Sequence, residues 1–418
     1  MPPAASVPTP PTSSSSSPDT SRFIDPPNAK LTAPIWVLMF GNFVVACGVL
    51  VVPGMLDALA QDLQISVPTA GTLLSVAALA MCLGAPFFAA ITSRVDRRLL
   101  LVSALLLLSL GHLACAWAPD YPMLAIIRPF SILGAAVFSP QAAATIGLMV
   151  PAQQRSTAVT TVFLGWSIAS VLGMPIGNLI ASHSTWRYSF LLIAAMALVA
   201  ALLVWRVIPK GLTVPPLTLA SWLQVARSSR LRLVVLATFI WCSGHLMVLG
   251  YITAALRALI AAPSSTQAML LTLMGVFGVG GNVLVSRMVS RIGPDMGARL
   301  SLSFVAGGMA LWGGAAIWLP EAWTLGLCMM VWGTGSFAFV SNQQARLATT
   351  APALASASLS LNTSSLYAGQ ALGAALGGLM LGYAGFTALA PVGAAVVALA
   401  LGVSVLADRH RPTPTTSI

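Results

Sequence analysis

Charged residues are scarce in this chain. Of its 418 residues, 7% are charged, against roughly a quarter in soluble domains, and the mean hydropathy is +0.90. These values exclude a soluble enzyme and a disordered protein. Acidic residues are the scarcest, with 9 Asp and Glu beside 20 Lys and Arg. The chain also lacks the G-x-x-x-x-G-K-[ST] pattern of a phosphate-binding loop, so nothing indicates ATP as an energy source.

Cysteine is also rare, with five residues that all lie inside apolar runs. They show neither metal-ligand spacing nor a pairing pattern typical of extracellular loops. We therefore expect no metal and no cofactor, and small packing residues at these positions: Cys47, Cys82, Cys115, Cys242 and Cys328.

Apolar residues, in contrast, make up 57% of the chain. A membrane-spanning helix needs roughly 20 mostly apolar residues, so this content is sufficient for about twelve spans. The runs are helix-length and rich in Ala, Leu, Gly and Val, which disfavours an outer-membrane barrel built of alternating strands. The predicted spans are 34–57, 68–92, 99–118, 122–148, 157–181, 187–208, 231–260, 267–289, 298–319, 323–345, 356–381 and 385–407.

The sequence thus predicts an all-α membrane protein with twelve transmembrane helices in two six-helix bundles. The N-terminal bundle covers 31–208 and the C-terminal bundle 231–407, with a basic, Pro-containing cytoplasmic linker at 209–230. Residues 1–30 are rich in Pro and Ser and cannot bury enough apolar surface to become ordered, so we expect a disordered cytoplasmic tail there. Residues 408–418 form a second tail.

The basic residues lie mostly in short connections, where they indicate orientation rather than nucleic-acid binding. If both termini are cytoplasmic, only Arg128, Arg187 and Arg257 of the 20 basic residues fall outside the cytoplasmic segments. This bias predicts a multi-pass protein of the bacterial inner membrane with both termini in the cytoplasm.

The two halves look related. Three positions match at an offset of 197 residues: Gly84 with Gly281, Ser93 with Ser290 and Arg94 with Arg291. Two related six-helix halves are typical of secondary transporters, in which the substrate site lies between the repeats near the midplane of the membrane.

Four segments carry a more specific signal. They are VVPGMLDALAQDLQISVPTAG (51–71), GAPFFAAITSRVDRR (84–98), RPFSILGAAVFSPQAAA (128–144) and GWSIASVLGMPIGN (165–178), which is followed by STWRYSF (184–190). In order and spacing they resemble motifs of the major facilitator superfamily, in particular the bacterial twelve-helix drug:proton antiporters that include arabinose and chloramphenicol exporters. The resemblance implies alternating access, with the two bundles rocking around one central cavity.

The fourth segment contains a stripe of small residues. Gly165, Gly173 and Gly177 lie on one helix face and permit close helix contact, while Pro175 frees a backbone carbonyl and bends the helix. The resemblance implies that this face gates exchange. A stripe of this kind also occurs at ordinary helix interfaces, so both interpretations stay open.

The second segment is a variant of the superfamily's signature loop between spans two and three, with Arg94, Asp96, Arg97 and Arg98. The usual acid is replaced by Ser93. In the family, that acid anchors a cytoplasmic charge network which stabilises the outward-facing state. Its loss from both halves predicts that such a network is missing and that the arginines serve as topology signals.

Arg128 lies about two helical turns inside the fourth predicted span, where a charge costs roughly 2.5–3.5 kcal/mol by insertion scales. Such residues usually face a water-filled cavity, with snorkelling to the surface as the alternative. We expect Arg128 to project into a central cleft, and the resemblance implies a role in proton coupling or substrate contact.

The proton carrier is harder to identify. Asp57, at the outer end of the first span, is the one acid near a span, and the deeper carboxylate of related exporters is missing. Coupling therefore depends on Asp57, on a histidine such as His112 or His245, or on a residue that the sequence does not identify. Either histidine could instead be a packed polar residue.

Polar and aromatic residues on the cavity-lining helices are candidate substrate contacts, although each could equally form an interhelical hydrogen bond. With few acids among them, they favour neutral or weakly anionic amphiphiles. The candidates are Asn42, Arg128, Gln141, Trp241, His245, Tyr251, Asn342, Gln343, Asn362, Tyr367 and Gln370.

These features predict a monomer that exports a small drug-like molecule or metabolite, such as a sugar or a chloramphenicol-like compound, in exchange for protons. The alternative is a proton-independent or proton-symport facilitator that imports a small metabolite. A membrane enzyme would need convergent His, Asp, Glu or Cys clusters and a sensor would need a soluble domain, and the sequence indicates neither.

Overall fold

The computed structural model describes residues 29–92, 95–151, 154–213, 219–351 and 354–409. Eleven helical stretches in this part of the chain are long and apolar enough to cross a membrane. The last of them, Ala357–Arg409, has 53 residues and is long enough for two spans. The predicted all-α membrane fold with twelve spans is therefore confirmed.

The N-terminal bundle consists of six helices. Side-chain caps begin four of them, because Ser66, Asp96, Asp120 and Thr185 each accept a hydrogen bond from a backbone N–H of the first turn. The helices are α1 (Ala29–Asp62), α2 (Val67–Ile91), α3 (Arg97–Ala116), α4 (Tyr121–Met149), α5 (Arg155–His183) and α6 (Trp186–Val207).

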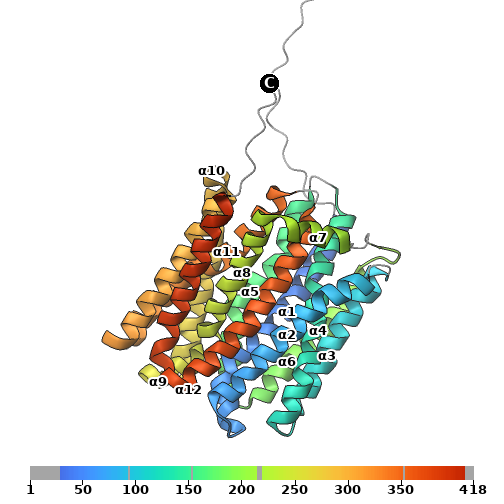
Figure 1. Cartoon of the computed structure of the whole chain (residues 1–418). Helices are drawn as coiled ribbons and strands as arrows, with labels where there is room; N and C mark the ends of the chain where they lie inside the picture. Colours follow the sequence, from blue (N-terminus) through green and yellow to red (C-terminus); the bar gives the residue numbers. More distant parts are fainter. Residues whose placement is uncertain (1–28, 93–94, 152–153, 214–218, 352–353, 410–418) are drawn as a thin grey trace, which may run out of the picture.

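The connection between the bundles contains a short helix, α7 (Leu219–Arg227), inside the predicted linker. The C-terminal bundle then follows with α8 (Ser229–Leu249), α9 (Ile252–Ile260), α10 (Ser264–Trp318), α11 (Ala322–Thr350) and α12 (Ala355–Arg409). Figure 1 shows α7 and α9 at opposite ends of the molecule, and we refer to these as the α7 end and the α9 end.

The C-terminal bundle differs from the prediction in where its helices break. The predicted span 231–260 is interrupted at Gly250 and Tyr251, which separate α8 from α9. Two predicted span pairs run on as α10 and α12, and each bends at a glycine with positive φ, Gly293 (77°) and Gly385 (71°). Glycine adopts this conformation without steric cost, so the chain reverses direction with almost no loop.

The bundle interiors depend on close glycine contacts. A Cβ atom added to Gly165 on α5 would lie 2.3 Å from the carbonyl oxygen of Met39 on α1, and one added to Gly373 on α12 would lie 2.2 Å from that of Ser243 on α8. The α1–α5 pair of one half therefore corresponds to the α8–α12 pair of the other. This equivalence agrees with the internal repeat.

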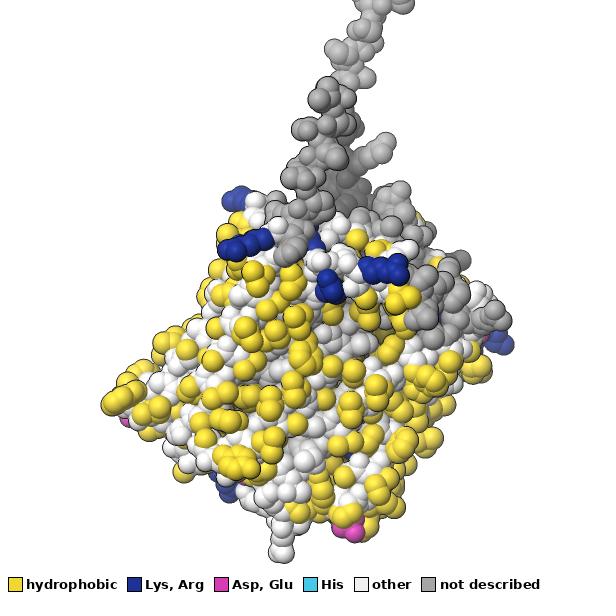
Figure 2. All heavy atoms as spheres, viewed as in Figure 1, with side chains coloured by type: hydrophobic (Ala, Val, Ile, Leu, Met, Phe, Trp, Pro, Cys, Tyr) yellow, Lys and Arg dark blue, Asp and Glu magenta, His cyan; other side chains and the backbone are white. Residues whose placement is uncertain are grey.

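The surface is apolar along its flank. In Figure 2, hydrophobic side chains cover the sides of the molecule, and most of the visible Lys and Arg side chains gather near the α7 end. This distribution suits a protein whose flank faces lipid and whose ends face water.

Candidate functional site

The two bundles are joined by polar contacts at the α9 end. Thr253 on α9 donates a hydrogen bond to the carbonyl oxygen of Pro53 on α1, at 3.1 Å. One turn further along α9, Arg257 forms an ion pair of 2.8 Å with Asp57 of α1. Asp57, a predicted pathway residue, thus contributes to the contact between the bundles.

Two further contacts close the same end. Asn178 on α5 donates to Gln267 on α10 at 2.9 Å. Tyr251 donates to the carbonyl oxygen of Ala374 on α12 at 2.7 Å, and a Cβ atom added to Gly71 on α2 would lie 2.0 Å from its hydroxyl. Tyr251, a predicted substrate contact, is therefore wedged between α2 and α12.

Arg128 lies elsewhere than predicted. Its side chain is 1% exposed and lies inside the N-terminal bundle, where it donates to the carbonyl oxygen of Gly48 on α1 at 2.7 Å. A second nitrogen lies 3.1 Å from Nε2 of His112 on α3, and the Phe190 ring of α6 lies 5.6 Å from the guanidinium carbon. In this conformation Arg128 is enclosed by its own bundle and does not project into a cleft between the bundles.

The predicted amide residues of the N-terminal bundle link its helices. Asn42 on α1 donates to the carbonyl oxygen of Val162 on α5 at 3.2 Å and accepts from Ser139 on α4 at 2.6 Å. Gln141 on α4 accepts from Arg97 at the start of α3. Both side chains therefore form interhelical hydrogen bonds, the alternative that sequence analysis left open.

The C-terminal bundle has an equivalent set. Thr238 on α8 donates to Asn362 on α12 at 2.6 Å, and Gln343 on α11 donates to Thr238 at 3.0 Å. Asn342 donates to the carbonyl oxygen of Ala338 on its own helix at 2.7 Å. The helices α8, α11 and α12 are thus connected by amide and hydroxyl side chains, as α1, α4 and α5 are in the other half.

An aromatic cluster occupies the space between α8 and α11. Trp241 stacks on His245 with ring centroids 5.1 Å apart and contacts Phe339 at 4.8 Å. Trp332 donates its indole N–H to Nδ1 of His245 at 2.9 Å. The indole N–H of Trp241 is buried and has no hydrogen-bond partner within the described residues.

Two further predicted substrate contacts, Tyr367 and Gln370, lie on α12. Tyr367 is buried, with 6% of its side chain exposed. Gln370 is half-buried, one turn further along.

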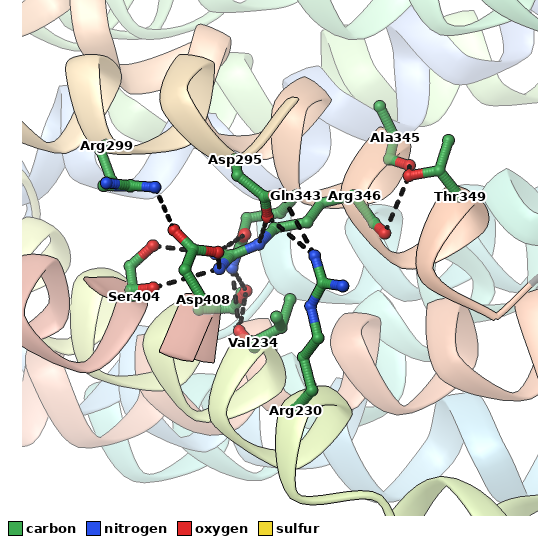
Figure 3. Close-up of polar contacts among 11 residues, drawn as sticks. Arg230, Val234, Asp295, Arg299, Gln343, Ala345, Arg346, Thr349, Ser404 and Asp408 are labelled. Atoms are coloured by element: carbon green, nitrogen blue, oxygen red, sulfur yellow. Dashed lines mark hydrogen bonds and ion pairs between the residues drawn. The ribbon is translucent and has the colours of Figure 1, made fainter. Parts of the chain in front are cut away.

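The structure contains a buried charge network that sequence analysis did not predict. Arg346, near the end of α11, is fully buried. It contacts Asp408 of α12 at 2.7 Å, donates to Ser404 at 2.8 Å, and forms an ion pair with Asp295 of α10 through Nε. Figure 3 shows Arg346 between the two aspartates.

Two more arginines complete what we call the Arg346 network. Arg230 of α8 contacts Asp295 at 3.1 Å, and Arg299 of α10 pairs with Asp408. Four helices of the C-terminal bundle are thereby joined at the α7 end. This half thus contains a charge network although the acid of the signature position is absent, and its acids are Asp295 and Asp408.

The signature loop contacts the linker between the two bundles. Arg94 lies outside the described residues. Asp96 caps α3 and also accepts from the backbone N–H of Gly211 in the linker. Burial raises the pKa of Asp96, but the backbone hydrogen bonds from Gly211, Leu99 and Arg98 together with the charge of Arg98 outweigh burial, and the pKa is lowered. Arg98 lies 4.2 Å above the Trp205 ring.

The predicted gating stripe packs inside the N-terminal bundle. Gly165 and Gly177 face α1 near Met39 and Val51, and Gly173 lies near Cys47. Pro175 lies within α5 between the last two glycines. The close helix contact inferred from the sequence is therefore present, and the gating role stays a prediction.

Two cavities of about 510 and 480 Å³ lie on the flank of the C-terminal bundle, away from the aromatic cluster. Small apolar side chains of α10, α11 and α12 line them, among them Ala310, Gly314 and Ala394. Neither cavity contains a predicted site residue.

The chain is similar to known membrane transport proteins. The sequence pattern of the Major Facilitator Superfamily matches residues 38–365. The inner membrane transport protein YdhP of Escherichia coli (strain K12) is 27% identical over 92% of this chain and 98% of its own length.

Two further relatives have more specific names. A probable sugar efflux transporter of Mannheimia succiniciproducens is 29% identical over 62% of this chain and 65% of its own length. A chloramphenicol resistance protein of Streptomyces lividans is 32% identical over 43% of this chain and 45% of its own length.

The fold is shared with a bacterial homologue of the human lysosomal transporter Spinster, solved in an inward-facing and unoccupied conformation. The TM-score is 0.73 at 14% identity, over 93% of this chain and 100% of the other.

Proposed function

Since the chain belongs to the major facilitator superfamily, we propose that it exports a small organic molecule across the bacterial inner membrane in exchange for protons. Members of this fold carry their substrate at the interface of two bundles that rock against each other. The proposal rests on one observation: polar contacts join the two bundles at the α9 end.

The orientation follows from the distribution of charge. The basic residues near the α7 end, together with the positive-inside rule, support a cytoplasmic α7 end and an outer α9 end. In this orientation both termini are cytoplasmic, and the structure corresponds to a state that is closed toward the outside.

The proposed substrate is a neutral or weakly anionic molecule with hydroxyl or carbonyl groups. The aromatic cluster of Trp241 and Phe339 offers flat apolar surface, and the unpartnered indole N–H of Trp241 offers one donor. The names of the relatives support sugars and chloramphenicol-like compounds as the first candidates.

Transport into proteoliposomes tests this function. We expect an acidic vesicle interior to drive accumulation of L-arabinose or chloramphenicol, because protons leave as substrate enters. One proton moved across 100 mV supplies about 2.3 kcal/mol, which supports roughly a fifty-fold gradient.

The same experiment separates the alternatives. Substrate movement that equilibrates without regard to the pH gradient would indicate a facilitator. Accumulation driven by an alkaline interior would indicate proton symport, and either result would contradict the export proposal.

A further inference from the structure

We propose that His112 is the proton acceptor of this exchange, and that protonation of its Nε2 releases Arg128 from α1. The inference deepens the proposed function and rests on proton exchange. It assigns the proton to a neutral base next to a buried cation, in a span region where the chain has no carboxylate.

The hydrogen bonds of His112 define its tautomer. Nδ1 lies 2.8 Å from the carbonyl oxygen of Leu108, which can only accept, so Nδ1 carries the hydrogen. Nε2 lies 3.1 Å from NH1 of Arg128, which can only donate. Nε2 is therefore an unprotonated acceptor, and His112 is neutral in this state.

A proton on Nε2 would abolish this arrangement. The lone pair that accepts from Arg128 would bind a proton taken from water, while Nδ1 keeps its bond to Leu108. Two donors and two positive charges would then face each other about 3 Å apart in a water-poor interior, where their repulsion is strong. Arg128 and the proton thus compete for the same nitrogen.

Among the described residues, no negatively charged side chain pairs with Arg128. Facing the His112–Arg128 pair are Cys115 of α3, the Gly48 carbonyl of α1 and the Phe190 ring of α6, whose centroid lies 5.7 Å from that of His112. Movement of Arg128 is therefore the available response to protonation.

Release of Arg128 would act on the closure at the α9 end. Arg128 holds α1 at Gly48, and the same helix carries the Pro53 carbonyl and the Asp57 carboxylate that contact α9. Asp57 lies about 14 Å beyond Gly48 along the helix, at 1.5 Å per residue. The hydrogen bond from Arg128 to Gly48 therefore positions the part of α1 that contacts the other bundle.

His245 provides a matched comparison. It is also a buried histidine in a span, but its Nδ1 accepts from the neutral indole of Trp332, and its stacking partner is Trp241. No cation competes for that nitrogen within the described residues. We therefore assign packing to His245 and proton binding to His112.

The test compares His112→Gln with His245→Gln in proteoliposomes, using radiolabelled L-arabinose and chloramphenicol as probes. Gln can accept from Arg128 but cannot bind a proton. We expect the accumulation driven by an acidic interior to be at least ten-fold lower in H112Q than in the unmodified protein. Substrate counterflow should persist in H112Q, but its rate should no longer depend on pH. H245Q should keep both pH responses.

Several results would overturn the inference. Gradient-driven accumulation in H112Q at the unmodified level would show that another group carries the proton. Loss of counterflow in both H112Q and His112→Asn would show a structural role, because counterflow involves no net proton movement. If the unmodified protein itself ignores the gradient with both probes, the proposed antiport fails, which is distinct from a failure confined to H112Q.

Discussion

Asp57 on α1 and Arg257 on α9 form an ion pair of 2.8 Å between the two bundles. The Asp57 side chain is 14% exposed and that of Arg257 is 54% exposed. Ion pairs with such access to water contribute only about 0–1 kcal/mol. The pair is therefore strong enough to bias the closed state at the α9 end and weak enough to be broken in every transport cycle.

Asp57→Asn should shift molecules toward a state that is open at the α9 end. A loss of about 1 kcal/mol changes the ratio of states roughly five-fold. Electron–electron distance measurements between spin labels at Ser66 of the first bundle and Ser265 of the second should show a larger long-distance fraction. Asp62→Asn is the control, because Asp62 pairs with Arg187 inside the N-terminal bundle. An equal shift in both variants would contradict the assignment.

Gly165→Ala should destabilise the N-terminal bundle. The new methyl would lie 2.3 Å from the Met39 carbonyl, and overpacking of this kind costs roughly 1–3 kcal/mol. Thermal unfolding in detergent measures the effect. Gly147→Ala on α4 is the matched control, since nothing lies within 4 Å of its added Cβ, and its melting temperature should stay unchanged or rise. Similar melting temperatures for the two variants would refute the close α1–α5 contact.

Arg346→Gln should be among the most damaging polar substitutions. It leaves Asp295 and Asp408 without their shared buried cation, and breaking a buried pair costs roughly 3–5 kcal/mol. The exposed Arg227 on α7 serves as the control, with Arg227→Gln close to neutral. Thermal unfolding of the two proteins should differ clearly. Equal stability would show that Arg346 does not stabilise the network.

Substitution by Phe should affect stability and substrate binding differently at the two tryptophans of the aromatic cluster, Trp332 and Trp241. Trp332→Phe removes the donor to His245 and should cost about 1–3 kcal/mol of stability, because a buried acceptor is left unpaired. Trp241→Phe removes a donor that has no partner among the described residues, so its effect on stability should be smaller while substrate binding weakens several-fold. Substrate binding that is unaffected by Trp241→Phe would remove this residue from the site.

The fold was predictable because a membrane span is encoded by local composition. Twelve apolar runs of the right length predicted twelve spans, and the described residues contain eleven span-length stretches, of which the last is long enough for two. The glycine stripe of α5 indicated its contact with α1. The break at Gly250 and Tyr251 had no comparable signal, since the residues on both sides are equally apolar. The bends at Gly293 and Gly385 depend on backbone conformation at single glycines, which runs of apolar residues do not reveal.

The candidate site was predictable only in part. The sequence predicts how deep Arg128 lies in its span. It does not predict which neighbouring helices the Arg128 side chain faces, because α4 is apolar around most of its circumference. The Arg346 network was missed because its members come from residues 230, 295, 299, 346 and 408, which only the folded chain brings together. Asn42 and Gln343 were predicted as substrate contacts with an interhelical hydrogen bond as the alternative, and in the structure both link helices.

Distances at both ends of the molecule test the account most directly. Spin-label pairs would join Ser66 with Ser265 at the α9 end and Lys210 with Arg409 at the α7 end, in a protein with its five cysteines replaced. The account predicts that acidification populates a state with a longer distance at the α9 end and a shorter one at the α7 end. Distances at both ends that stay unchanged across pH, with and without L-arabinose or chloramphenicol, would contradict alternating access driven by protons.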